Sequence, residues 1–249
     1  MTRWPSRRTR VRTPASFDDA DAELGAVLHS LEHAHNYLDW LADLFRPHIT
    51  GDTAEIGAGT GTITARLEEM ADTVRAVEPS NAAFAQLDER FVGHSTVTCV
   101  LGDHTSLEVA SCDSILLSNV LEHIEDDLGT LTELRTSLRP GGSLIVFSPA
   151  FEALYSDFDR RVGHYRRYRK AEIVNRFEAA GLTVVDARYL NALGGCAWFV
   201  YARLLRRNPT NDGSLSAWDR FVIPMIRFVE NRVRLPFGQS VLIVGRWNP

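Results

Sequence analysis

The sequence contains few cysteines and a single lysine, and it has no net positive charge. Its three cysteines (Cys99, Cys112 and Cys196) stand far apart, so we expect no metal-binding pair and no disulfide framework, but reduced thiols in a cytoplasmic protein. Lys170 is the single lysine among 27 basic residues, a bias that we attribute to coding rather than to chemistry. The net charge of −5 argues against a general nucleic-acid binder.

Long apolar runs are also missing. The longest, residues 192–205, contains Arg203 and is too short to cross a bilayer. The first 14 residues are rich in arginine and lack the apolar core of a secretory signal. We expect residues 1–16 to form a disordered basic tail, in preference to a nucleic-acid or membrane arm, and residues 17–249 to form one domain.

From residue 53 onwards, short β-branched runs alternate with helical patterns, which indicates a parallel sheet with helices on both faces. We expect strands at residues 53–57, 73–78, 96–101, 113–118, 143–148, 182–190 and 241–245, and helices at 18–46, 62–70, 80–91, 126–138, 170–180 and 215–233. The strand at 182–190 should pair with the last strand and close the sheet in antiparallel fashion. Residues 192–236 would then form a helical insert that serves as part of a substrate cap.

A glycine-rich turn follows the first expected strand. It reads Glu55-Ile-Gly57-Ala-Gly59-Thr-Gly61. Glycines allow a sharp strand-to-helix turn without Cβ atoms, and a helix N-terminus offers N–H groups to an anionic ligand group. A dinucleotide site prefers Gly-x-Gly-x-x-Gly, whereas here the third glycine comes one residue early. A turn without any ligand is the alternative.

Acidic and amide side chains end the next three strands. Glu78 ends the second, Asp103 and His104 the third, and Asn119 the fourth. Because ligands bind at the carboxyl ends of strands in open α/β sheets, these positions favour a nucleoside-containing cofactor. A carboxylate such as Glu78 can accept hydrogen bonds from both ribose hydroxyls.

Taken in order over residues 35–148, these motifs resemble the class I S-adenosylmethionine-dependent methyltransferases. The segment Asn119-Val-Leu-Glu122-His123 is similar to the small-molecule types 11 and 12 of that family. The resemblance implies a doubly wound, Rossmann-like sheet of seven strands, mixed because the last strand is antiparallel, with N-terminal helices. It also implies the contacts of the cofactor. The methionine moiety would contact Glu55, Gly57, Gly59 and Gly61, the ribose would contact Glu78, and the adenine would lie between Asp103 and His104. Asn119 would lie beneath the sulfonium, and Tyr37 would cover the cofactor.

Methyl transfer needs alignment of the reacting atoms and exclusion of water, and it needs a general base only when the acceptor keeps its proton until attack. Four residues near the sheet edge are candidates for catalysis: Glu122, His123, Tyr155 and His164. A structural role for His123 at the start of a helix is an equal alternative.

A basic and aromatic segment, residues 156–170, follows the fifth strand, where this fold often carries its substrate loop. Guanidinium groups bind carboxylates and phosphates, which suggests an anionic acceptor. The alternative is a solvated loop whose arginines pair with Asp157 and Asp159. The candidate substrate residues are Arg160, Arg161, Tyr165, Arg166, Arg167 and Tyr168.

The apolar start of the insert, residues 193–207, could line a lipophilic pocket or touch a membrane surface, although packing or a dimer face is the simpler interpretation. His29 and His33 are one helical turn apart, but no third ligand accompanies them, so we expect no metal site.

The sequence therefore predicts transfer of a methyl group from S-adenosylmethionine to a small molecule. We consider an amphiphilic or phosphate-bearing acceptor, such as a prenyl diphosphate or a lipid-linked intermediate. Two alternatives stay open: a nucleotide-dependent oxidoreductase, and a catalytically silent subunit that binds the cofactor for a partner.

Overall fold

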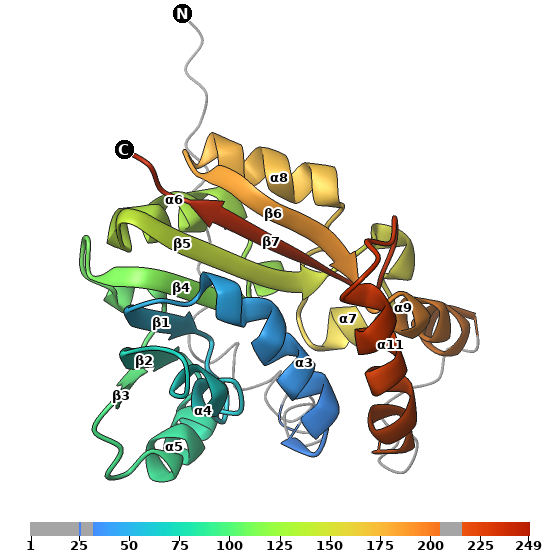
Figure 1. Ribbon diagram of the computed structural model, residues 1–249, viewed down its shortest axis with the longest axis horizontal. Helices are drawn as coiled ribbons and strands as arrows, with labels where there is room; N and C mark the ends of the chain where they lie inside the picture. Colours follow the sequence, from blue (N-terminus) through green and yellow to red (C-terminus); the bar gives the residue numbers. More distant parts are fainter. Residues whose placement is uncertain (1–24, 26–31, 205–215) are drawn as a thin grey trace, which may run out of the picture.

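The computed structural model describes residue 25, residues 32–204 and residues 216–249. Its centre is a seven-stranded sheet (Figure 1). The strands are β1 (Asp52–Ile56), β2 (Thr73–Glu78), β3 (Val97–Leu101), β4 (Cys112–Ser118), β5 (Leu138–Pro149), β6 (Thr183–Leu190) and β7 (Ser240–Arg246). Their order in the sheet is β3-β2-β1-β4-β5-β7-β6.

Strand directions confirm the predicted mixed sheet. The pairs β1–β2, β2–β3, β1–β4 and β4–β5 are parallel, whereas β7 runs antiparallel to both β5 and β6. The chain moves outwards from β1 to β3 and then returns to place β4 on the other side of β1. Strands β1 and β4 therefore flank the topological switch point, where open α/β sheets bind ligands.

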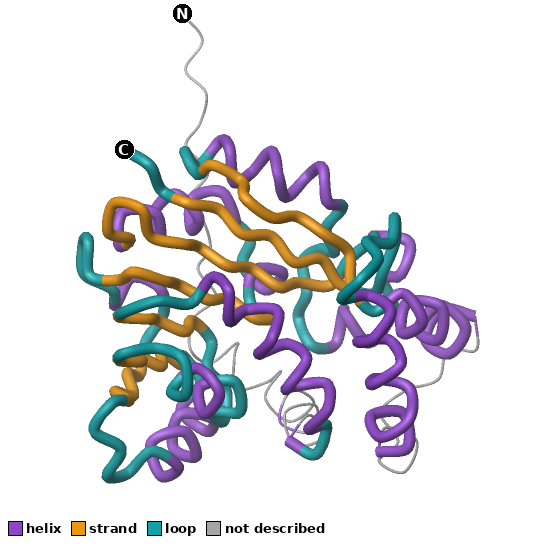
Figure 2. The backbone as a smooth tube through the Cα atoms, in the orientation of Figure 1, coloured by secondary structure: helices purple, strands orange, loops and turns teal. Residues whose placement is uncertain are grey.

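Helices cover both faces of the sheet (Figure 2), and the alternation of side chains along each strand explains why. In β4, Ile115 and Leu117 pack in one core cluster, and Leu116 packs in the other. The first cluster includes residues of α6 (Asp127–Ser137) and α8 (Lys170–Ala179). The second includes residues of α3 (His35–Phe45), α4 (Thr64–Leu67), α5 (Asn81–Arg90) and α11 (Ile223–Glu230). Strands buried on both faces read as continuous apolar runs, as they do here.

Several element boundaries differ from the prediction by one to five residues. The helix expected at 62–70 is reduced to α4, and in the turn after it the Leu67 C=O accepts bonds from both the Met70 and the Ala71 N–H groups, at 3.0 and 2.9 Å. Strand β5 begins five residues earlier than expected, since Leu138 already pairs with Cys112 of β4. The basic tail and most of the predicted helix before residue 32 lie outside the described residues.

The insert between β6 and β7 contains α9 (Ala192–Trp198), a π-helical stretch (Phe199–Leu204), a second one (Trp218–Val222) and α11. It is tied to α3, since the Asp219 carboxylate accepts hydrogen bonds from the backbone N–H groups of Asn36 and Tyr37. Figure 1 shows α11 beside α3, in front of the sheet. Whether the insert caps a substrate stays a prediction. None of the helices in the described ranges is both long and apolar enough to cross a membrane.

Candidate functional site

The glycine turn between β1 and α4 has a backbone that other residues adopt only with strain. Gly57 and Gly61 have φ angles of 72° and 82°. A Cβ atom added to Gly57 would collide with the Val120 side chain, and one added to Gly61 would collide with Phe91. Glycine at both positions therefore serves conformation and close packing at once.

Glu78, at the end of β2, is held against this turn. Its side chain is buried, Oε2 accepts a 2.7 Å hydrogen bond from the Gly59 N–H, and Oε1 accepts a 2.8 Å bond from the Ser80 N–H. These two backbone bonds fix Glu78 at the carboxyl edge of the sheet.

Glu55 lies one step deeper, at the end of β1. It is 2% exposed, and its Oε2 accepts a 2.6 Å hydrogen bond from the Thr64 hydroxyl. Burial raises the pKa of Glu55 to about 8, and the neighbouring charge of Glu78 adds to the increase. Glu55 is therefore mostly protonated at neutral pH in this structure.

Three other predicted cofactor residues follow the ends of β3 and β4. Asp103 accepts hydrogen bonds from the backbone and hydroxyl of Thr105; these outweigh the effect of its partial burial and lower its pKa. His104 pairs instead with Glu133, with 2.9 Å between Nε2 and Oε2. Asn119 is exposed directly after β4 with a φ of 55°.

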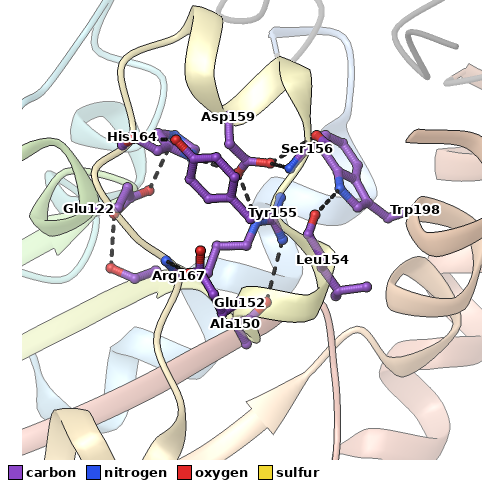
Figure 3. Close-up of polar contacts among 11 residues, drawn as sticks. Glu122, Ala150, Glu152, Leu154, Tyr155, Ser156, Asp159, His164, Arg167 and Trp198 are labelled. Atoms are coloured by element: carbon purple, nitrogen blue, oxygen red, sulfur yellow. Dashed lines mark hydrogen bonds and ion pairs between the residues drawn. The ribbon is translucent and has the colours of Figure 1, made fainter. Parts of the chain in front are cut away.

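Beyond β4, a buried polar cluster begins at Glu122 (Figure 3). Glu122 is 0% exposed, and its Oε2 accepts a 3.0 Å hydrogen bond from the Ser148 hydroxyl of β5. Burial raises the pKa of this carboxyl group. Its Oε1 lies 4.0 Å from His164 Nε2, and the His164 ring packs edge to face with that of His123, with centroids 4.6 Å apart.

Asp159 anchors the other side of His164. Its Oδ1 lies 2.8 Å from His164 Nδ1 and accepts a 2.7 Å bond from Arg167 Nε, and its Oδ2 accepts bonds from the Ser156 backbone and hydroxyl. Burial alone would raise the pKa of Asp159, but the bonds from His164 and Arg167 outweigh it and lower the pKa to about 2. Tyr155 completes the frame, since its hydroxyl donates a 2.8 Å bond to the carbonyl of His164.

Comparisons with known proteins identify the family to which this chain belongs. The profile described as "Methyltransferase domain" matches residues 54–146. Nodulation protein S of Azorhizobium caulinodans is 30% identical over 196 residues, which cover 76% of this chain and 89% of that protein. The chain belongs to the S-adenosylmethionine-dependent class I methyltransferases.

Solved structures agree on the fold of this methyltransferase. A putative methyltransferase from Haloferax volcanii, solved in complex with the Trm112 activator, has a TM-score of 0.65 at 19% identity and covers 94% of this chain and 98% of its own. A geranyl diphosphate methyltransferase has a TM-score of 0.61 at 13% identity and covers 83% and 77%. Other curated relatives are matched only in part: the chain spans 39%, 56% and 58% of the length of three of them.

The methyltransferase fold brings two groups of predicted residues together. Glu55, the three glycines and Glu78 meet at the switch point, and Glu122, His123, Tyr155 and His164 gather after β4. Their individual roles stay predictions.

The basic segment divides into exposed and internal parts. Arg160, Arg161 and Tyr165 are exposed and stay candidates for substrate binding. Arg160 is nevertheless paired with Asp157, as the alternative of a solvated loop expects. The other three side chains point to internal partners, which favours the structural interpretation for them. Arg166 pairs with Asp127, Arg167 with Asp159, and the Tyr168 hydroxyl donates to Asp127.

Asp159 is the central residue that sequence reasoning did not place in the site. It was considered only as a surface partner for arginines. A signal existed, because Ser156 and Asp159 form a Ser-x-x-Asp capping box at the start of α7 (Asp157–Arg161). That pattern locates a helix start, but it does not reveal that the Asp159 carboxylate faces His164 Nδ1.

Proposed function

We propose that this chain transfers the methyl group of S-adenosylmethionine to a small-molecule acceptor. The observation that carries the proposal is the position of Glu78, a buried carboxylate fixed by the Gly59 N–H beside a glycine turn at the switch point. Family membership supports the same donor.

The residues present fit this cofactor. Glu78 would accept hydrogen bonds from the ribose hydroxyls, and the side-chain-free surface of Gly57 and Gly59 would admit the methionine moiety. Glu55 would give up its proton when an ammonium group binds nearby, since a positive charge favours the carboxylate form. Tyr37, half-buried and held through its backbone by Asp219, would cover the site.

Bound S-adenosylmethionine would supply an electrophilic methyl group. The chain's own residues would position the acceptor in line with that group and exclude water. The cluster after β4 is the place for the acceptor atom, because Glu122, His123 and His164 can hold a polar group and remove its proton. Tyr155 is better suited to positioning, since its hydroxyl is bonded to the backbone of His164.

An amphiphilic or phosphate-bearing acceptor is supported by the surface near the cluster. Arg160 and Arg161 are exposed on α7, and Phe199 and Tyr201 are exposed on the insert. A side chain of the insert, Trp198, donates from Nε1 to the Leu154 carbonyl, so the apolar and basic segments adjoin. The geranyl diphosphate methyltransferase illustrates such an acceptor on the same fold.

Calorimetric titration with S-adenosylmethionine, S-adenosylhomocysteine and NAD tests the donor. We expect micromolar affinity for the first two and none for NAD. Glu78→Gln should weaken binding of both by about 1–3 kcal/mol through loss of charge-assisted hydrogen bonds. Glu89→Gln is the matched control, since Glu89 is exposed on α5, and it should bind as the wild type does.

The same titration tests the first alternative, and a methyl-transfer assay tests the second. Binding of NAD alone would establish a nucleotide-dependent oxidoreductase and overturn the proposal. Transfer of a labelled methyl group to an isoprenyl diphosphate or another phosphorylated lipid would support the acceptor class. Cofactor binding without transfer to any acceptor would favour the silent subunit.

A further inference from the structure

One oxygen of the polar cluster has no hydrogen bond. Glu122 is 0% exposed, and within the described part of the chain its Oε1 is a buried atom without a hydrogen-bond partner. Leaving a buried polar atom unsatisfied costs about 1–3 kcal/mol, and more for a charged group. Such an atom indicates a ligand that the protein chain itself does not supply.

The atoms that face this oxygen are nitrogens of histidine. His164 Nε2 lies 4.0 Å from Glu122 Oε1, which is too long for a hydrogen bond. One ligand atom each from Glu122, His123 and His164 lie within 4.8 Å of one another. Ligands about 2.0–2.2 Å from a shared zinc ion are themselves roughly 3.3–4 Å apart, so small side-chain rotations would complete such a site.

The orientation of His164 is fixed from behind. Its Nδ1 faces the Asp159 carboxylate at 2.8 Å, so a neutral His164 would carry its ring proton on Nδ1 and turn Nε2 towards Glu122. Asp159 is in turn held by Arg167 and by Ser156 (Figure 3). A carboxylate that accepts from the outer nitrogen of a histidine is the usual support of a metal ligand.

We propose that Glu122, His123 and His164 bind one divalent transition-metal ion, with Zn²⁺ as the best match. Two imidazoles and one carboxylate suit Zn²⁺ better than Mg²⁺ or Ca²⁺, which prefer sites made of oxygen alone. Three protein ligands leave a position open, as in catalytic zinc sites. In combination with the proposed methyl transfer, on which this step rests, the ion would take over from these three side chains the activation of an acceptor oxygen at that position, and the proton of that oxygen would pass to water.

Metal binding can be measured without any acceptor or cofactor. Protein stripped with a chelator is titrated with Zn²⁺ in competition with a chromophoric chelator, and Co²⁺ is used to record the visible absorption of the bound ion. We expect one equivalent of Zn²⁺ and a Co²⁺ spectrum typical of low coordination number. His123→Ala, His164→Ala and Glu122→Gln should each weaken binding at least 100-fold.

Two further variants distinguish ligands from general disruption. Asp159→Asn should weaken Zn²⁺ binding 10- to 100-fold, since it leaves the three ligands in place but weakens the support of His164. His94→Ala is the matched control: His94 is also paired with a glutamate, with 3.0 Å to Glu68, but on the surface, and its loss should leave binding unchanged. Circular dichroism verifies the fold of each variant.

The outcomes separate this inference from the proposed function. Uptake of less than one equivalent by the wild type, or unchanged uptake by folded His164→Ala and His123→Ala, would refute the metal site. Binding of S-adenosylmethionine depends on Glu78 and is measured separately, so failure of that titration would leave the metal result standing, and the reverse also holds.

Discussion

Glu55 should make the stability of this protein fall between pH 5 and pH 8, and Glu55→Gln should remove that dependence. The folded state raises the pKa of Glu55 from 4.5 to about 8, mainly by burial. A folded-state pKa above the unfolded value means that the native protein binds more protons in this range. The stabilisation that protonated Glu55 contributes to the folded state is therefore fully present below pH 4.5 and is lost as the pH rises through 8.

The size of the effect follows from the two pKa values. A shift of about 3.5 units corresponds to about 5 kcal/mol in total, and about 3.5 kcal/mol of it is lost between pH 5 and pH 8. Glutamine has the shape of a neutral glutamic acid, and its side-chain oxygen can still accept the bond from Thr64. Between pH 5 and pH 8, the free energy of unfolding of the variant should thus rise by about 3.5 kcal/mol relative to that of the wild type.

Urea unfolding of both proteins at pH 5, 6, 7 and 8 measures the difference. Titration of every other group is common to the two proteins and cancels in the comparison. Glu89→Gln, a change of an exposed carboxylate on α5, should run parallel to the wild type at every pH. If the free energy of unfolding of Glu55→Gln also changes with pH as that of the wild type does, then Glu55 is ionised in the native state and the argument from burial is refuted.

Three further changes test the local geometry. Gly57→Ala should cost about 1–3 kcal/mol in urea unfolding, because alanine is strained at a positive φ and its Cβ meets Val120. Asp159→Asn should remove about 2.5 kcal/mol of stability that the wild type has at pH 5 and loses as the pH falls through 2, since the folded-state pKa is lowered to about 2; about 1 kcal/mol of this should be lost between pH 5 and pH 3, where unfolding of both proteins measures it. Tyr155→Phe should cost about 1 kcal/mol through its lost bond to the His164 carbonyl, and an unchanged unfolding midpoint would contradict it.

The fold was predictable because its signals are local. Strand β4 is apolar at consecutive positions, as a strand covered on both faces must be, and helix patterns separate it from its neighbours. The antiparallel pairing of β6 with β7 was also predicted and is confirmed. The predicted element boundaries were wrong where tertiary contacts determine them. At Leu138, for example, pairing with Cys112 extends β5.

The positions of Glu55 and Glu78 at the strand ends could be predicted from the sequence, whereas the side-chain environments in the basic segment could not. The parallel topology alone brings the ends of β1 and β2 to one edge, so Glu55 and Glu78 could be placed together from sequence. Charge pattern alone cannot tell whether an arginine faces solvent. Arg167 is buried because Asp159 lies eight residues away in the sequence but 2.7 Å away in space, and no periodicity encodes that contact.

These internal pairings change how the acceptor can be recognised. Asp127 of α6 and Asp159 of the segment already offset Arg166 and Arg167. Glu122 adds a carboxyl group without a guanidinium partner within 4 Å among the described residues. The cluster as the chain alone builds it is therefore not a positive pocket and does not favour an anionic acceptor. A divalent ion on Glu122, His123 and His164 would reverse that balance. Under the two proposals taken together, transfer to a phosphorylated acceptor should require the metal, whereas binding of the methyl donor should not.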